Sequence, residues 1–189
     1  DIITRYDGHV AVPALTYPIR FFSGGMLRPY KGLDALFDLF QLGNAPANAR
    51  LIVAGRNDME AVLPPCEKIE WHISGEILSE AEFFQCVRSS HFTILPYPRS
   101  LTSGMLLYSF SCGTPVIAPN YGHFKALITP SNGFLYDPQD PDGLAQAIEH
   151  ACSIEAGRYE RMRKNALETA RAYPWQQSSK RLFSQSFSS

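Results

Sequence analysis

Apolar runs alternate with amphipathic runs along most of this chain. The short apolar runs have the length and composition of buried strands. The longer runs are amphipathic; residues 32–42, for example, place Leu33, Leu36 and Phe37 on one helical face. The pattern predicts strands at 19–23, 50–54, 68–73, 91–95, 115–118 and 133–136, and helices at 32–42, 79–89, 105–111, 123–128, 142–152 and 154–172, with a weakly helical tail at 175–183.

Three of these elements carry local signals that define their type or limits. Ser79 is followed three residues later by Glu82, the spacing of a capping box at a helix start. Gly43 and Asn44 are typical of the end of the first helix. Residues 68–73 alternate polar and apolar side chains, which indicates an edge strand.

The regular alternation of strand and helix predicts an α/β fold. With short connections and right-handed crossovers, the sheet is expected to be a Rossmann-like, doubly wound parallel sheet with helices on both faces. Residues 1–18 are interpreted as a leader or linker, and residues 19–189 as one domain.

Ligands of such sheets bind outside the carboxyl ends of the strands, and glycines gather there in the predicted arrangement. We expect Gly24-Gly25 to follow the first strand, Gly55 the second, Gly75 the third, and Ser103-Gly104 to lie beyond the fourth. Each glycine alone is explained equally well as a turn residue. Their gathering on one rim predicts a crevice.

Composition and charge narrow the classes of partner. The formal net charge of the 189 residues is −1, so no overall field recruits nucleic acid or an acidic membrane, and any anion site must be local. No apolar run approaches the length of a membrane span. The four cysteines lack metal-type spacing, and we interpret them as small hydrophobes in a reducing compartment. The first residue, Asp1, suggests a fragment or a processed chain.

The segment TSGMLLYSFSCGTPVIAP, residues 102–119, carries the strongest chemical signal. A small, hydroxyl-rich turn of Thr102, Ser103 and Gly104 opens an apolar helix that includes Met105. Backbone N–H groups at a helix start are unpaired and favour a phosphate. The alternative is that Ser103 simply caps a core helix.

Basic residues flank the predicted strand ends. Arg28 and Lys31 lie between the first strand and the first helix, and Lys31 precedes a helix start, where the dipole disfavours a cation. A bound anion explains a lysine there, although a solvated loop lysine and a surface ion pair for Arg28 stay open. Arg99 precedes the 102 turn, and Arg56 and Asn57 follow the second strand, in reach of a nucleotide or sugar. Together these groups would clamp a diphosphate.

Several enzyme classes lack their signatures here. The five histidines form no pair with metal-ligand spacing, and no metal is expected. The chain has no Gly-x-Ser-x-Gly elbow, no Gly-x-x-x-x-Gly-Lys-Ser/Thr loop, and no Gly-x-Gly-x-x-Gly at the first turn. The last absence counts against a dinucleotide-cofactor enzyme.

Five segments in order resemble the C-terminal, donor-binding half of GT-B glycosyltransferases of the family-4, group-1 retaining type. They are residues 21–36, 50–55, 73–83, 94–119 and 132–148. The resemblance implies transfer of a hexose from a UDP- or GDP-sugar to a glycan or lipid-linked acceptor, with no cofactor beyond this donor, in polysaccharide biosynthesis. It also implies a missing N-terminal domain that supplies the acceptor site and a catalytic residue. The expected location is cytoplasmic, in solution or at the cytoplasmic face of the membrane.

The resemblance also assigns roles to residues of this chain. Lys31 would hold the donor diphosphate, the amides of 103–105 would receive the phosphates, and 75–77 would line the base. The predicted donor-binding residues are Gly25, Arg28, Lys31, Gly55, Arg56, Asn57, Gly75, Ile77, Ser100, Thr102, Ser103, Gly104, Met105 and Tyr108, with Arg99 and Lys31 stabilising the departing diphosphate and the catalytic residue unassigned.

The chain departs from the family pattern at three positions. Met26 stands where the family usually has arginine, and Ser100 and Tyr108 stand where it has paired glutamates. Tyr108 is able to bond a ribose hydroxyl but not to act as a carboxylate. These departures favour an alternative, a non-catalytic nucleotide-sugar binding or regulatory module. Half of a nucleotide-sugar epimerase is a third reading with a poorer segment match.

Overall fold

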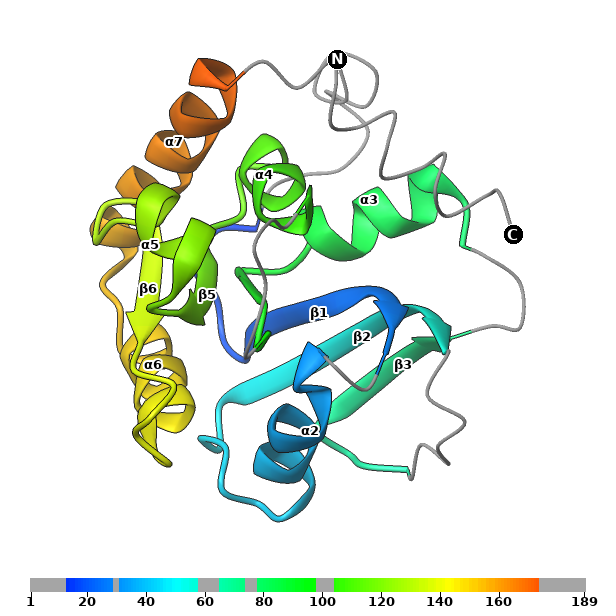
Figure 1. Ribbon diagram of the computed structural model, residues 1–189. Coiled ribbons are helices and arrows are strands. Elements are labelled where there is room, and N and C mark those ends of the chain that lie inside the picture. The colour runs from blue at the N-terminus through cyan, green and yellow to red at the C-terminus, as the bar shows by residue number, and fades with distance from the viewer. Residues whose placement is uncertain (1–12, 29–30, 58–64, 74–77, 98–103, 174–189) are drawn as a thin grey trace.

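The computed structural model confirms the α/β prediction and describes residues 13–28, 31–57, 65–73, 78–97 and 104–173. Six parallel strands form one sheet in the order β3-β2-β1-β4-β5-β6 (Figure 1). The strands are β1 (Ile19–Leu27), β2 (Ala49–Asn57), β3 (Ile69–Ile73), β4 (Phe92–Ile94), β5 (Val116–Pro119) and β6 (Gly133–Tyr136). The helices are α2 (Leu33–Gln41), α3 (Glu80–Arg88), α4 (Gly104–Ser111), α5 (Gly122–Leu127), α6 (Gly143–Cys152) and α7 (Ala156–Ala172).

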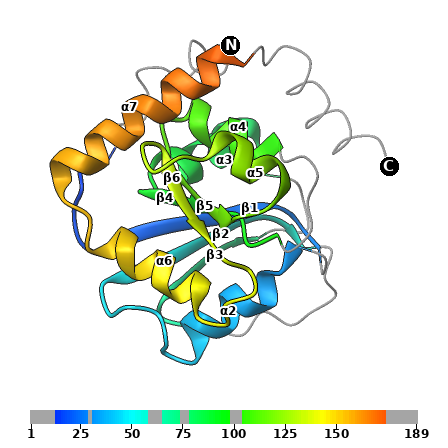
Figure 2. The same cartoon turned by 60° about the vertical axis from the view of Figure 1, so that its left-hand side comes forward.

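Helices cover both faces of the sheet, as the doubly wound prediction requires. The apolar sides of α2 and α6 pack on one face, and those of α3, α4 and α5 pack on the other (Figures 1 and 2). Helix α7 contributes to both layers: Tyr159 and Met162 join the first cluster, and Ala166 and Ala170 join the second. The predicted limits of the helices agree with the structure to within two residues at each end.

Strand β1 lies at the centre of the sheet and organises the core. It pairs with β2 over nine residues on one side and with β4 on the other. Phe21 stacks on Phe92 of β4 at 6.0 Å between ring centroids and meets Phe40 of α2 edge-on at 6.5 Å. Because all three rings are buried, they join the centre of the sheet to the helix that covers it.

The predicted ends of β1 and β2 are wrong. Both strands run on through the glycines, β1 to Leu27 and β2 to Asn57, so neither Gly24-Gly25 nor Gly55 is a turn after a strand. Gly25 lies opposite Gly55 in the β1–β2 register, and a Cβ at Gly55 would lie 1.9 Å from the Gly25 carbonyl oxygen. The glycines therefore allow two backbones to approach closely inside the sheet.

Two local predictions are confirmed. Strand β3 is at the edge of the sheet. Ser79 caps α3 in a capping box: its Oγ accepts from the Glu82 N–H at 3.3 Å, and its own N–H donates to the Glu82 carboxylate at 2.9 Å. The Ser79 hydroxyl also donates to the Glu82 carboxylate at 2.7 Å. The hydrogen bonds from the Ser79 hydroxyl and from the Ser79 N–H to this carboxylate lower the pKa of Glu82 because they favour its charged form.

His91 ties the segment before β1 to the amino end of the sheet. Its side chain is fully buried at the start of β4, and its Nδ1 accepts a hydrogen bond from the Arg20 N–H at 2.9 Å. The ring proton then lies on Nε2, which donates to the Ala14 carbonyl oxygen at 3.1 Å. The His91 imidazole thus connects the start of β4 both to Arg20 in β1 and to Ala14 in the segment that leads into β1. The interpretation of residues 1–18 as a linker stays a prediction.

Candidate functional site

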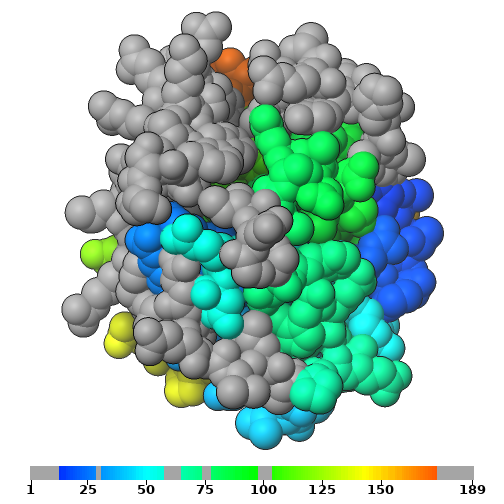
Figure 3. All heavy atoms as spheres, turned by 90° about the vertical axis from the view of Figure 1, so that its right-hand side faces the viewer, coloured from blue at the N-terminus to red at the C-terminus, as the bar shows by residue number. Residues whose placement is uncertain are grey.

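The predicted site residues that the structure describes gather at the carboxyl ends of β1, β2 and β4. Strand β1 continues through α2 into β2 on one side, whereas its neighbour on the other side, β4, comes much later in the chain. The connections leave β1 and β4 in opposite directions, which makes this the topological switch point where ligands of open α/β sheets bind. Figure 3 faces this edge of the molecule, where blue, cyan and green segments of the chain meet.

Lys31 reaches across the end of β1 toward β4. Its backbone N–H donates to the Arg28 carbonyl oxygen at 3.0 Å, and Gly32 follows in a left-handed conformation (φ 65°) as the N-cap of α2. The Lys31 Nζ lies 5.2 Å from the centre of the Tyr97 ring, beyond β4, and 3.7 Å from where a Cβ at Gly25 would be. The ammonium group thus lies beside the Gly25 backbone, and Tyr97 gives it an aromatic face.

Tyr97 lies at the candidate site beside Lys31 and is not among the residues predicted from the sequence. It is 5% exposed and packs against Phe124 of α5 at 6.1 Å between ring centroids. The available signal was its position: an aromatic residue between two prolines, directly after a buried strand, at the edge where ligands bind.

Two guanidinium groups meet at Met26. The Nη2 of Arg28 lies 3.3 Å from the Met26 Sδ, and the Nη2 of Arg56 lies 3.8 Å from the same sulfur. Met26 and Arg56 are direct partners in the β1–β2 register, and Asn57 ends β2 beside Leu27. The structure thus brings Arg28 and Arg56 together, with Lys31 following on the same turn.

Helix α4 begins at Gly104, where the sequence predicts that backbone N–H groups bind a phosphate. Met105 is 8% exposed and belongs to the same apolar cluster as Tyr97. Tyr108 is 1% exposed, and its ring packs against Phe83 of α3 at 5.6 Å between ring centroids. A ribose contact from Tyr108 stays a prediction, and it requires this buried hydroxyl to become accessible.

Six of the predicted site residues lie outside the described part of the chain. They are Gly75, Ile77, Arg99, Ser100, Thr102 and Ser103. The proposed approach of Lys31 to the Ser103 turn is therefore untested. Within the described ranges, no group of three or more His, Cys, Asp or Glu side chains is placed to hold a metal ion. No helix in the same ranges is both long and apolar enough to cross a bilayer.

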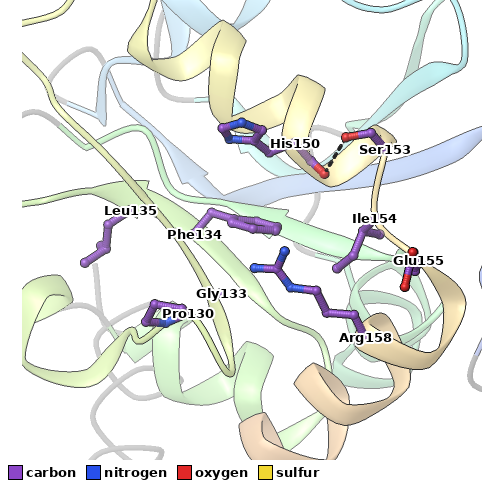
Figure 4. Close-up of a pocket in the computed structure, with 9 residues that line it drawn as sticks. All are labelled: Pro130, Gly133, Phe134, Leu135, His150, Ser153, Ile154, Glu155 and Arg158. Carbon is purple, nitrogen blue, oxygen red and sulfur yellow. Dashed lines mark hydrogen bonds between the residues drawn. The ribbon is translucent and has the colours of Figure 1, made fainter.

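A separate pocket of about 600 Å³ lies at the amino end of β6, between that strand, the end of α6 and the start of α7. Phe134 lies at its centre, with the His150 ring on one side at 6.5 Å and the Arg158 guanidinium on the other at 5.6 Å (Figure 4). No predicted donor-binding residue lines it. In a parallel sheet the amino ends of all strands lie on the side opposite their carboxyl ends. The pocket at the amino end of β6 is therefore distinct from the group of Lys31, Arg28 and Arg56.

Comparison with known sequences identifies relatives. The sequence profile described as "Glycosyl transferases group 1" matches residues 18–153. A GDP-mannose:glycolipid 4-beta-D-mannosyltransferase of Xanthomonas campestris pv. campestris is 28% identical over 130 residues, which cover 65% of this chain and 37% of that protein. The chain therefore spans little more than a third of this relative.

Solved structures share the fold. Sucrose-phosphate synthase from Thermosynechococcus elongatus aligns with a TM-score of 0.69 at 20% identity, over 99% of this chain and 48% of that one. The C-terminal domain of a glycosyl transferase group 1 family protein from Francisella tularensis aligns with a TM-score of 0.64 at 14% identity, over 82% of this chain and 85% of that domain. The second match has nearly the same extent as this chain and is itself one domain of a larger protein.

Proposed function

Because this chain belongs to the group 1 glycosyl transferases, we propose that it binds the nucleotide-sugar donor for a hexosyl transfer. In this proposal residues 19–189 form the donor half, and a second, N-terminal domain supplies the acceptor site. The acceptor is a glycan or a lipid-linked sugar. No metal is needed if side-chain cations stabilise the departing diphosphate.

The observation that carries the proposal is the position of Lys31. Its ammonium group lies at the switch point of the sheet, between Gly25 of β1 and Tyr97 beyond β4. Two guanidinium groups follow along the same edge, at Arg28 and Arg56. Three cations at the carboxyl ends of parallel strands suit a diphosphate because they can neutralise its negative charge. In the proposed reaction this diphosphate is the group that departs when the sugar is transferred.

For the donor, we propose a GDP-sugar ahead of a UDP-sugar. The support is the 28% identical relative, whose name specifies GDP-mannose as donor and a glycolipid as acceptor. A location at the cytoplasmic face of the membrane would follow from such an acceptor.

We propose transfer with retention of configuration, on the resemblance to the retaining type. The name of the 28% identical relative specifies a β-linked product. The anomeric configuration of the product is therefore the measurement that tests retention. With an α-linked donor and the enzyme joined to its acceptor domain, proton NMR of the anomeric centre should show an α-linked product. A β-linked product would replace retention with inversion and leave the donor-site proposal intact.

Lys31→Ala is expected to weaken binding of GDP to the chain about tenfold or more. A charge-assisted hydrogen bond to phosphate contributes about 1.5–3 kcal/mol, and tenfold corresponds to about 1.4 kcal/mol. Isothermal titration with GDP, UDP and their sugars measures the effect. Lys164→Ala, on the exposed face of α7, is the matched control and should leave the affinity unchanged.

Two other results are informative. If neither nucleotide binds the unaltered chain, the donor-site proposal is wrong. If nucleotide-sugar binds but the protein joined to its acceptor domain transfers no sugar, the non-catalytic module is the better reading. The burial of Tyr108, in place of an accessible carboxylate, favours this second candidate.

A further inference from the structure

We propose that the pocket at the amino end of β6 binds a small organic carboxylate, with the Arg158 guanidinium as its anion-binding group. The pocket lies on the side of the sheet opposite the proposed donor site, and none of the described donor-site residues lines it. Its ligand is therefore additional to the nucleotide-sugar, and the inference does not depend on the proposed function.

The pocket has the size and the lining of a small-molecule site. Its volume of about 600 Å³ lies within the range of about 300–1,000 Å³ that ligand pockets span. The apolar part of its wall comes from the turn before β6, from β6 and from the segment after α6: Pro130, Phe134, Leu135 and Ile154. Such a wall suits the body of an organic molecule and gives an inorganic ion nothing to contact.

Arg158 presents an anion-binding group inside this pocket. Its guanidinium lies over the Phe134 ring, 5.6 Å from the ring centre, and Figure 4 shows it directed toward Phe134 and away from the Glu155 carboxylate. Among the described residues, no carboxylate or carbonyl oxygen pairs with Arg158. The contact with Phe134 uses the face of the guanidinium, so the N–H donors in its plane stay available to a ligand.

His150 adds a second polar group across the Phe134 ring from Arg158 (Figure 4). The centres of the two rings are 6.5 Å apart. In the described part of the chain, nothing makes a hydrogen bond to the imidazole nitrogens of His150. The Ser153 hydroxyl is already engaged, since it donates to the His150 carbonyl oxygen at 3.2 Å. The imidazole of His150 is therefore the group that can contact a polar substituent of the ligand.

The charges around the pocket favour a carboxylate over a phosphate. The planar fork of arginine binds either group bidentately. Glu155, however, lies three residues before Arg158 and lines the same pocket, so its negative charge repels an anionic ligand. A phosphate monoester, with a charge of about −1.5 to −2 at pH 7, is repelled more strongly than a carboxylate, which carries a single charge. The ligand we infer combines one carboxylate with an apolar body.

An NMR titration of the ¹⁵N-labelled 189-residue chain with benzoate tests this site. The amide signals of β6 and of residues 153–158 should move, those of Gly25 and Lys31 should not, and saturating GDP should leave the benzoate affinity unchanged. Benzamide has the shape of benzoate without its charge, and acetate has the charge without the ring. Each should bind at least tenfold more weakly than benzoate, and phenyl phosphate should bind no more tightly than benzoate.

Two variants should change the affinity in opposite directions. Arg158→Met is expected to weaken benzoate at least tenfold and to leave the weak binding of benzamide unchanged, and Arg158→Lys should recover only part of the loss because an ammonium lacks the fork. Glu155→Gln should strengthen benzoate about twofold, since it removes the like charge. Arg161→Met, exposed on α7 and outside the pocket, is the matched control. Urea unfolding of each variant checks that it is folded.

The outcomes separate this pocket from the donor site. If benzoate moves no signal, moves those of Gly25 and Lys31 instead, or is displaced by GDP, the inferred site is wrong. If benzamide binds as tightly as benzoate, or Arg158→Met has no effect, the anion-binding role of Arg158 is wrong. Tighter binding of phenyl phosphate would overturn the choice of a carboxylate. None of these results bears on the donor-site proposal, which Lys31→Ala tests separately.

Discussion

Replacing Gly55 with alanine should lower the free energy of unfolding by about 4 kcal/mol. The new Cβ would lie 1.9 Å from the Gly25 carbonyl oxygen and 2.8 Å from the Gly25 carbonyl carbon, both backbone atoms without rotamer freedom. Gly55 also has φ 140°, a conformation that is strained for an L side chain. Backbone strain of about 1–3 kcal/mol and overpacking of about 1–3 kcal/mol combine in this estimate.

Urea denaturation followed by circular dichroism measures the loss. Gly43→Ala is the matched control, since Gly43 also has a positive φ of 79° but no atom within 4 Å of its added Cβ. It should cost only the backbone conformation, about 1 kcal/mol. Equal losses at the two positions would show that the close approach of β1 and β2 adds nothing. Because the distortion lies one residue before Met26 and Arg56, GDP binding should weaken in any folded Gly55→Ala protein.

Acidification from pH 7 to pH 4 should cost the fold about 3 kcal/mol through His91 alone. The pKa of His91 is lowered from 6.5 to about 4, mainly by burial and in smaller part by the nearby charges of Arg20 and Arg163, against the opposing effect of the hydrogen bond to the Ala14 carbonyl. The unfolded chain therefore takes up a proton near pH 6.5, whereas the native protein takes it up only near pH 4. Between these values the unfolded state binds more protons, so stability falls as the pH falls.

Urea unfolding at several pH values between 7.5 and 4.5 checks the sign and the size. In His91→Gln the part of the slope that belongs to this residue should disappear, although the variant starts from a lower stability because the Arg20 and Ala14 hydrogen bonds are weakened. His72→Gln is the control, since His72 is exposed on the edge strand. Identical slopes in the unaltered chain and in His91→Gln would contradict the prediction.

The sequence predicts the order and type of the elements because hydrophobic period and capping are local. The capping box of Ser79 and Glu82 is complete within four residues, and the edge position of β3 follows from its alternation. The limits of β1 and β2 fail for the opposite reason. Gly25 and Gly55 are read locally as turns, and only their meeting across the sheet makes them part of two strands.

The candidate site is predicted only in part for a similar reason. Lys31, Arg28 and Arg56 stand out as cations next to strand ends, and the structure brings them to one edge. The convergence of Arg28 and Arg56 on Met26 depends on the β1–β2 register, and the contact of Lys31 with Tyr97 depends on β4 lying beside β1. Both are relations between segments far apart in the chain, which periodicity does not encode.

The central place of β1 has a consequence for synthesis on the ribosome. Strand β2 pairs with one side of β1, and β3 with β2, as they emerge, but the other side of β1 is completed only when β4 appears, about 65 residues later. Until then that side of β1 keeps a row of unpaired backbone groups, and the Phe21 ring lacks its contact with Phe92. A nascent chain stalled before β4 should therefore be a preferred client of chaperones that bind extended apolar strands.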